Sequence, residues 1–377
     1  MDIRPRVHLI NFLRKMAINA VFFLAPLHFL KVGFNGWQIG FVVSVYALTP
    51  LLVSFPTGWI NDRLAITRVV QGGLVASGLI YLLLSRTGEF VPTAILFAIL
   101  GAANAVLDVS LNSLYFKDER EVDPNRKFGV LSFWLNLGIS VGSLVGGALI
   151  FFEGFEVMLY FMAGLMFAAL LAVRHFGAGK FEMVSIREYR LSFFRRKALL
   201  LSLMLFILTL HWGVEGTVYS PFLKQAFGLN PLQLAVYISA ALFVMALASY
   251  RVSRRPFEPK ANERLFLIGM LLSGAGLMLM TVPNVYLSFL ARVAHEAGDG
   301  TMAALATILI SRLFAKRNIG GNSGLLQAVF TLGSMAGAQI FSPLGYSLGL
   351  RVPFLIAGGL LVADCVFAYF LFKKLAY

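Results

Sequence analysis

The stretch VPFLIAGGLLVADCVFAYFLF, residues 352–372, contains a single charged side chain, that of Asp364. An α-helix needs about 20 apolar residues to cross a bilayer, so this stretch predicts a membrane-spanning helix. Similar runs precede it, and the chain of 377 residues is 59% hydrophobic and 13% charged. Soluble domains carry roughly 25% charged residues. The composition therefore predicts an all-α membrane protein with little room for a soluble domain.

The hydropathy pattern predicts twelve transmembrane helices separated by short loops. Their approximate bounds are Leu9–Leu30, Trp37–Ile60, Arg68–Ser85, Pro92–Phe116, Phe128–Phe152, Phe155–His175, Ala198–Lys224, Pro231–Tyr250, Arg264–Val282, Val285–Phe314, Ser323–Ser347 and Val352–Phe372. No cleavable signal peptide is expected, because no small-residue cleavage site follows the first run. Cys365 is the only cysteine, so no intramolecular disulfide is possible.

Basic residues collect in every second loop and at both ends of the chain. The N-terminal cluster holds Arg4, Arg6, Arg14 and Lys15, whereas the odd-numbered loops hold only Lys31, Arg86, Lys224 and Arg351. Because translocation disfavours Lys and Arg, we expect the clusters and both termini to be cytoplasmic. The net charge of +14 thus follows membrane topology and does not indicate a nucleic-acid partner.

The longest loop, from Phe176 to Lys197, divides the chain into two halves that resemble each other. At an offset of 195 positions, four residues of the first half recur in order in the second: Pro26, Gly33, Asn35 and Gln38 match Pro221, Gly228, Asn230 and Gln233. A duplicated six-helix unit places a binding site near the membrane midplane between the halves. We expect pseudo-symmetric bundles at 1–175 and 198–377, joined by a cytoplasmic linker at 176–197.

The loop after the second helix reads Gly58-Trp59-Ile60-Asn61-Asp62-Arg63-Leu64-Ala65-Ile66-Thr67-Arg68. A Gly, an acid four residues later and then basic residues resemble the signature of the major facilitator superfamily, although Ala65 stands where that family usually has Gly. The resemblance covers nearly the whole chain. It implies secondary transport by alternating access. It also implies a cytoplasmic latch that sets the inward/outward equilibrium, formed by Gly58, Asp62, Arg63 and Arg68.

Polar side chains inside the predicted helices form the candidate binding site. A charge at a helix centre costs about 2.5–3.5 kcal/mol on insertion scales, so a polar stripe must face protein or water. Three stripes have helical spacing, and the resemblance implies that their helices line the cavity; Asn136 and Gln327 occupy equivalent positions in the repeat. The candidate substrate- and ion-binding residues are Asn19, Asn104, Asp108, Asn136, His211, Glu215, Tyr219, Arg292, His295, Glu296, Asp299 and Gln327.

Structural interpretations of the same charges stay open. Arg292 and Glu296, four residues apart, could neutralise each other as a purely structural pair. Asp108 lies nearer the cytoplasmic end of its helix and could simply reach water there. Asp364 lies on a helix that the resemblance places at the periphery, which favours a packing contact.

The intramembrane charges also predict the coupling ion. Five acids against Arg292 would leave a large negative charge in a medium of low dielectric constant. Burial favours the neutral form of a carboxyl group, so we expect at least one acid to be protonated near neutral pH and to carry protons, Glu215 first and Asp299 second. Sodium is the alternative, because carboxylates and Asn side chains also suit hard cations.

Other function classes lack their motifs. The sequence contains no G-x-x-x-x-G-K-[ST] and no H-E-x-x-H, so we expect neither an ATP-driven pump nor a metalloprotease. The prediction is a monomeric, proton-coupled secondary transporter of a small solute in the cytoplasmic membrane, with the bilayer as its surroundings. We expect no enzymatic activity, no cofactor and no metal centre. A channel, a uniporter or a lipid scramblase of the same fold is the alternative.

Overall fold

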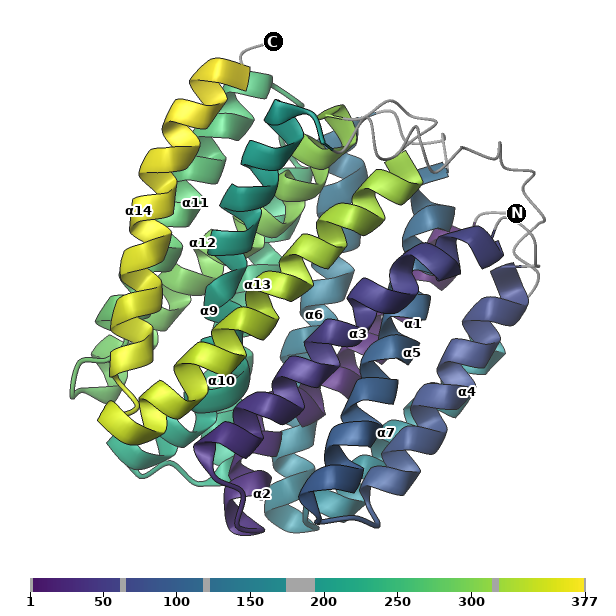
Figure 1. Ribbon diagram of the computed structural model, residues 1–377, viewed down its shortest axis with the longest axis vertical. Coiled ribbons are helices and arrows are strands. Elements are labelled where there is room, and N and C mark those ends of the chain that lie inside the picture. Colours follow the sequence, from purple (N-terminus) through teal and green to yellow (C-terminus); the bar gives the residue numbers. More distant parts are fainter. Residues whose placement is uncertain (1–2, 62–65, 118–122, 174–193, 314–318, 376–377) are drawn as a thin grey trace.

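The computed structural model describes residues 3–61, 66–117, 123–173, 194–313 and 319–375, which are helical apart from short turns. Figure 1 shows the long helices running side by side, with the start of α1 and the end of α14 at the same end of the molecule. An even number of crossings requires this arrangement. The all-helical membrane fold predicted from hydropathy is confirmed.

The first half of the chain contains seven α-helices in the described ranges: α1 (Arg4–Phe22), α2 (Ala25–Lys31), α3 (Gly36–Asn61), α4 (Ile66–Leu84), α5 (Phe90–Lys117), α6 (Pro124–Phe152) and α7 (Phe155–Ala169), with the 3-10 turn η1 (Leu170–Ala172). The second half contains α9 (Arg196–Phe227), α10 (Pro231–Ser253), α11 (Pro259–Leu279), α12 (Val285–Leu313), α13 (Ile319–Leu348) and α14 (Val352–Leu375).

These elements make up the twelve predicted spans in the described part of the chain, since α1 and α2 together form one. By length and composition, ten spans are apolar enough to cross a membrane, including Arg4–Lys31. The helices α12 and α13 complete the set with 29 and 30 residues. Because α12 carries Arg292, Glu296 and Asp299 along its middle, it must be accommodated by protein contacts rather than lipid.

The first span is broken where the sequence predicted one continuous helix. The helix α1 ends at Phe22 and α2 begins at Ala25. Pro26 provides the physical reason, because it lacks an N–H and its ring clashes with the carbonyl group four residues earlier, that of Phe22. The break leaves Phe22 and Phe23 at the junction, where they contact the other half.

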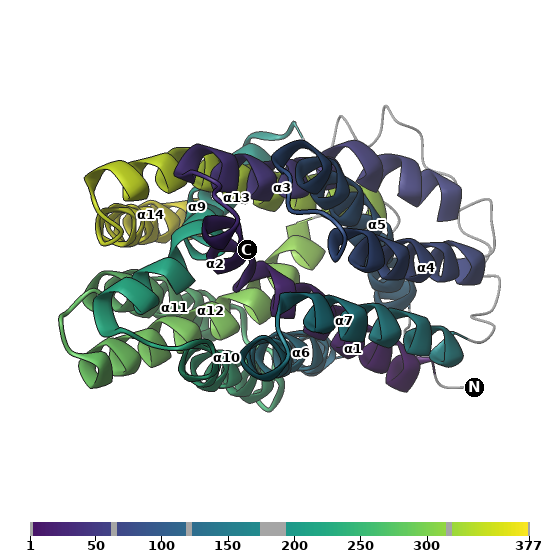
Figure 2. The ribbon, with the colours of Figure 1, turned by 90° about the horizontal axis from the view of Figure 1, so that it is seen from below.

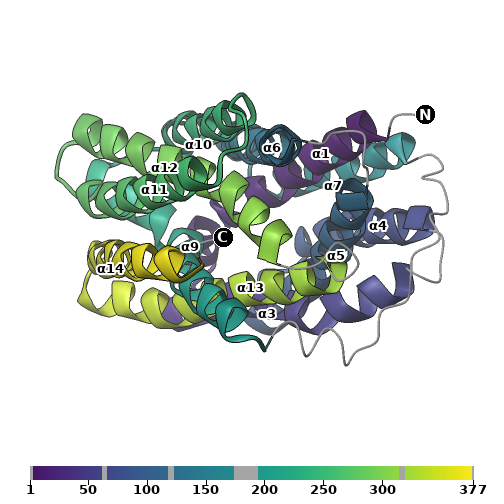
Figure 3. The ribbon, with the colours of Figure 1, turned by 90° about the horizontal axis from the view of Figure 1, so that it is seen from above.

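In the described part of the chain, the most extensive contacts between the halves are those of α6 with α10 and of α3 with α13. Both pairs lie side by side in the views from either end (Figures 2 and 3). In the first pair, Ser140 Oγ donates to the carbonyl oxygen of Ser239 at 2.9 Å. In the second, Ser342 Oγ donates to the carbonyl oxygen of Gly36 at 2.6 Å. Hydroxyl groups thus tie the halves together where close packing of small residues lets the backbones approach.

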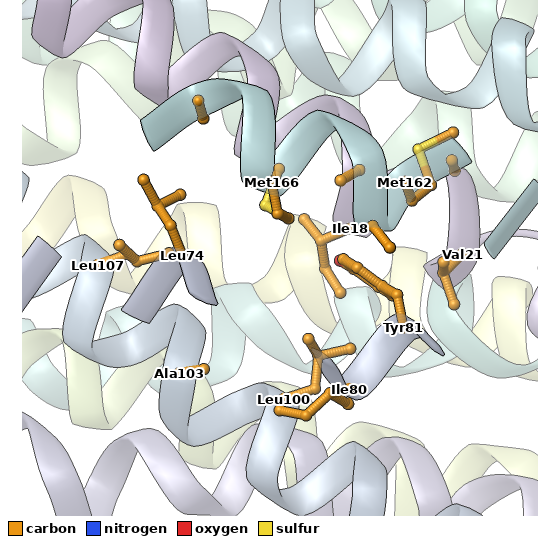
Figure 4. Close-up of a cluster of buried hydrophobic side chains, with 14 of the residues drawn as sticks. Ile18, Val21, Leu74, Ile80, Tyr81, Leu100, Ala103, Leu107, Met162 and Met166 are labelled. Atoms are coloured by element: carbon orange, nitrogen blue, oxygen red, sulfur yellow. The ribbon is translucent and has the colours of Figure 1, made fainter. Parts of the chain in front are cut away.

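The apolar core of the first half packs between α1, α4, α5 and α7. Figure 4 shows Ile18, Leu74, Tyr81 and Met166 meeting there, and all four are buried. The opposite face of α4 is different, since Leu83 is 55% exposed. An apolar face of this kind is suited to lipid, so α4 presents one side to the core and the other to the bilayer.

Candidate functional site

Polar side chains from α9 and α12 form a single buried group, which we call the C-terminal cluster: His211, Glu215, Tyr219, Arg292, His295, Glu296 and Asp299. Two of the three predicted polar stripes therefore face each other inside the second half. Spacing of three to four residues on each helix puts the members of a stripe on one face. Ion pairs and hydrogen bonds between long side chains of α9 and α12 then connect the two faces.

Arg292 is the central cation of the cluster. Its guanidinium forms ion pairs with Glu215 from α9 and with Glu296 one turn further along α12. The guanidinium carbon also lies 4.2 Å from the centre of the Tyr219 ring, a cation–π contact. Arg292 and Glu296 do pair as the spacing suggested, but the pair is not self-contained, because the same guanidinium also holds the acid on α9.

Two histidines connect the remaining acids. His295 Nε2 lies 3.0 Å from Glu215 Oε1, and His211 Nε2 lies 3.0 Å from Asp299 Oδ2. Asp299 Oδ2 is also 3.9 Å from His295 Nε2. The side chains therefore form a continuous polar path from His211 through Asp299 and His295 to Glu215.

Ser273 on α11 is a member of this path that the sequence did not single out as a site residue. Its hydroxyl group donates to Asp299 Oδ1 at 2.6 Å and lies 2.9 Å from His295 Nδ1. A serine in an apolar helix gives little signal by itself, because it can also bond to its own backbone. Only the packing of α11 against α12 reveals its contacts.

The first half contains a simpler buried pair, Arg14 of α1 with Asp108 of α5. Arg14 Nε also donates to Asn11 Oδ1 at 2.8 Å. The arginine side chain is 1% exposed, whereas that of Asp108 is 25% exposed. Asp108 thus has both a buried cation and access to solvent.

This pair corrects the assignment of Arg14 to the N-terminal basic cluster. Arg14 lies within the membrane-spanning part of α1 and adds an intramembrane cation to the charges counted from the sequence. Its position inside the first predicted run, Leu9–Leu30, was the available signal. The sequence position of Arg14 does not indicate which helix provides its acidic partner.

The other predicted site residues that the structure describes have hydrogen bonds outside both groups. Asn19 and Asn104 donate to carbonyl oxygens of their own helices, those of Lys15 at 2.9 Å and Leu100 at 3.0 Å. Asn136 Nδ2 donates to Ser249 Oγ at 2.9 Å and so links α6 to α10 across the two halves. Gln327 belongs to α13, but its side chain lies outside the described part of the chain.

The predicted latch is described only in part. Gly58 lies near the end of α3 and Arg68 is exposed near the start of α4. Asp62 and Arg63 lie outside the described residues. On α14, Asp364 is 2% exposed, and within the described part of the chain its two carboxyl oxygens have no hydrogen-bond partner.

An aromatic contact places the C-terminal cluster next to the interface between the halves. The rings of Phe23 and Tyr219 meet edge to face with their centroids 6.2 Å apart. Phe22 lies against Gly216, where a Cβ atom would collide with its ring. Nothing in the sequence distinguished these two among the 35 Phe residues.

Two sets of potential metal ligands occur within the cluster, although the sequence predicted no metal centre. Their donor atoms lie within 4.8 Å of one another in His211, His295 and Asp299, and again in Glu215, His295 and Glu296. In the second set Arg292 already forms an ion pair with each of the two carboxylates. In the first set Asp299 is already bonded to His211 and Ser273. The arrangement as it stands is therefore an ion-pair and hydrogen-bond network in which every acid has a partner, whereas Arg292 Nε and the Tyr219 hydroxyl group have no hydrogen-bond partner among the described residues.

Comparison with known proteins relates this arrangement to a large group of carriers. The family model described as Major Facilitator Superfamily matches residues 7–262 and 260–376. The chain is 22% identical over 354 residues to "Multidrug resistance protein 2" of Bacillus subtilis strain 168, covering 89% of this chain and 86% of that protein. It is 32% identical over 110 residues to the "Multi-drug resistance efflux pump PmrA homolog" of Lactococcus lactis, covering 29% and 27%.

Solved structures share the fold at low sequence identity. The human organic anion transporter MFSD10 superposes with a TM-score of 0.76 at 16% identity, over 97% of this chain and 98% of that one. A bacterial homologue of the human lysosomal transporter Spinster, solved in an inward-facing and unoccupied conformation, gives 0.76 at 14% identity over 99% and 96%. At these identities the likeness establishes the fold alone.

Proposed function

The chain belongs to the major facilitator superfamily, and from that membership we propose that it moves a small solute across the cytoplasmic membrane by alternating access, driven by protons. The chain is a multi-pass membrane transporter of this family, and members of the family are not normally enzymes. The coupling ion, the solute and the orientation of the termini are the parts proposed here.

One observation carries the proposal of proton coupling: Glu215 and Asp299 lie buried in the same hydrogen-bonded path with two histidines. Ionisable residues inside a membrane protein are expensive and tend to mark ion pathways. Histidine is the side chain whose ordinary titration range lies closest to physiological pH. We assign proton carriage to Glu215 and Asp299, with Arg292 holding Glu215 in place.

The position of the cluster supports a link between protonation and alternating access. Tyr219 contacts Arg292 on one side and Phe23 of the other half on the other. In the proposed rocking motion, the contact between Phe23 and Tyr219 is made in one state and broken in the other. Tyr219 therefore connects the charges around Arg292 to the contact with Phe23, so we expect a change of protonation to affect that contact.

The remaining assignments extend the sequence predictions. We propose that both termini are cytoplasmic and that the halves 1–175 and 198–377 rock about the site between them, with 176–197 as linker. The latch role stays with Gly58, Asp62, Arg63 and Arg68. Asn19, Asn104, Asn136, Gln327 and the pair of Arg14 with Asp108 are proposed as polar contacts on the path of the solute.

Export of drug-like compounds is the direction that the relatives favour. Both curated relatives carry names that refer to multidrug resistance. A cationic dye such as ethidium is therefore the first compound to test. Sodium is the second candidate for the coupling ion, since carboxylate oxygens also suit that cation.

The proposal is tested with purified protein in liposomes under an imposed pH gradient, with and without sodium. Ethidium accumulation should follow the pH gradient in the wild type, ignore sodium, and be lost in Glu215→Gln. The matched control is Glu153→Gln, an exposed acid at the C-terminal end of α6, which should accumulate dye as the wild type does.

Three results would contradict the assignment. A Glu215→Gln protein that stays gradient-driven would remove Glu215 as a carrier. If dye accumulation depended on the sodium gradient alone, the coupling ion would be sodium and not the proton. Dye movement that ignores both gradients would leave a uniporter or a channel, and the acids would then be structural or would bind the solute directly.

A further inference from the structure

We infer that the C-terminal cluster holds two protons, one between His295 and Glu215 and one between His211 and Asp299. If the proposed proton coupling is correct, on which this inference rests, a cycle that empties the cluster moves two protons and not one. The inference stands on the hydrogen-bond partners of four ring nitrogens. It also stands on the balance of charge inside the second half.

The Nδ1 atoms of both rings are held by backbone carbonyl groups. His295 Nδ1 lies 2.8 Å from the carbonyl oxygen of Ser273, and His211 Nδ1 contacts the carbonyl oxygen of Leu208. A carbonyl oxygen can only accept a hydrogen bond. Each ring must therefore carry a hydrogen on Nδ1, which assigns the tautomer from the partners.

Ser273 gives an independent check on His295. Its single hydroxyl hydrogen is directed to Asp299 Oδ1, at 2.6 Å. The hydroxyl oxygen can then only accept from His295 Nδ1, which lies 2.9 Å away. Both contacts of His295 Nδ1 therefore require the ring nitrogen to be the donor.

The Nε2 atoms of both rings face carboxylate oxygens. His295 Nε2 is 3.0 Å from Glu215 Oε1, and His211 Nε2 is 3.0 Å from Asp299 Oδ2. A bare ring nitrogen and an ionised carboxylate are both acceptors, so their lone pairs would repel at this distance. One hydrogen must lie in each contact, either on the nitrogen as an imidazolium or on the oxygen as a carboxylic acid.

Charge balance gives the same count. The cluster contains three carboxyl groups, those of Glu215, Glu296 and Asp299, against the permanent positive charge of Arg292. Two added protons make the group electrically neutral, which a buried site of low dielectric constant requires. With one proton the group would hold a net negative charge.

The other polar groups that face the cluster do not change this balance. Tyr219 lies against Arg292, and Tyr237 of α10 shares a hydrogen bond of 2.8 Å with Ser288 of α12. Phenol and serine hydroxyl groups are neutral at ordinary pH. Emptying the cluster releases one proton to water from each contact and leaves a neutral imidazole and an ionised carboxylate that no longer share a hydrogen bond.

The test counts the two protons directly in the purified full-length protein in lipid nanodiscs. Labelling the five histidines with 15N distinguishes protonated from bare ring nitrogens by NMR, and infrared spectroscopy detects protonated carboxyl groups. At neutral pH we expect a hydrogen on both Nδ1 atoms and one proton in each of the two Nε2 contacts. Raising the pH should remove the protons of the two Nε2 contacts and leave the hydrogens on the two Nδ1 atoms.

Variants assign the two signals. His295→Gln and His211→Gln should each remove the ring-nitrogen signals of one contact and leave those of the other contact. His28→Gln is the matched control, because His28 stacks on Phe155 of α7 outside the cluster, and it should leave both. The count itself is made on the wild type, so a variant that does not fold does not affect it.

The outcomes separate this inference from the proposed function. A bare Nε2 beside an ionised carboxylate at either contact at neutral pH would overturn the count, even if transport follows the pH gradient. Two protons in a protein whose transport ignores the gradient would support the count and refute proton coupling. In liposomes at zero membrane potential, the logarithm of the ethidium ratio should change twice as steeply as the pH difference; an equal change would overturn two-proton exchange.

Discussion

The two halves contain buried charges of very different kinds. In the first half Arg14 meets one acid, Asp108, whose side chain is 25% exposed. In the second half Arg292 meets Glu215 and Glu296, whose side chains are 9% and 2% exposed, with Asp299 close by. One arginine balances one acid without any proton, whereas one arginine against three acids does not. Among the described residues, the buried acids of the second half therefore need titratable partners, and there the histidines His211 and His295 contact them.

The largest difference between the halves should appear when each arginine is replaced by methionine, which keeps an unbranched apolar stem. Removing one partner of a buried pair costs about 3–5 kcal/mol of stability. Arg292→Met should reach that range, because it leaves two buried acids uncompensated. Arg14→Met should cost about 1–3 kcal/mol, because Asp108 can recover water.

Thermal unfolding of the purified variants in detergent provides the measurement. Arg86→Met on the loop after α4 is a suitable control, since its side chain is exposed and lies over the Tyr160 ring in a cation–π contact at 5.8 Å. Equal losses for Arg14→Met and Arg292→Met would break the comparison.

The second contrast concerns the acids themselves. Asp299→Asn should abolish gradient-driven accumulation of dye, because the amide cannot take part in the contact with His211 as a proton carrier. Asp108→Asn should reduce the rate and leave the pH dependence where it is, since its partner is a permanent cation. The pH profile of ethidium transport in liposomes measures both effects. A shift of this profile along the pH axis in Asp108→Asn would show that the first half contains a proton carrier as well.

Two prolines at equivalent positions in the repeat show a smaller difference. Pro26 ends α1 at Phe22, whereas Pro221 lies inside α9, which continues to Phe227. The carbonyl group freed by Pro221 is that of Thr217, and Tyr346 OH donates to it at 3.3 Å. A helix tolerates proline in a membrane when a neighbour satisfies the freed backbone group in this way.

Tyr346→Phe should therefore destabilise the protein by about 1–3 kcal/mol, the cost of an unsatisfied buried acceptor. The loss should shrink when Pro221→Ala is added, because alanine supplies its own N–H to Thr217. A thermal-unfolding cycle over the two single variants and the double variant measures the coupling. Independent, additive effects would show that Tyr346 does not support the proline.

The sequence by itself determined the membrane spans, the family and the polar faces of single helices. Hydropathy over about 20 residues is a local property, and a stripe such as His211, Glu215 and Tyr219 follows from helical spacing alone. The functional role of these residues stays a prediction, but the grouping on each helix needed no tertiary information. Even the break at Pro26 had a local signal in the proline itself.

Tertiary structure alone decided which stripes meet. The rotation and approach of α9, α11 and α12 place Ser273 between Asp299 and His295, and the packing of α1 on α5 gives Arg14 its acid. The same holds for Pro26 and Pro221, since the hydroxyl group that bonds to the carbonyl group freed at the second proline belongs to Tyr346 on a distant helix. Local spacing cannot determine these partners, because each contact depends on the relative position of helices far apart in the chain.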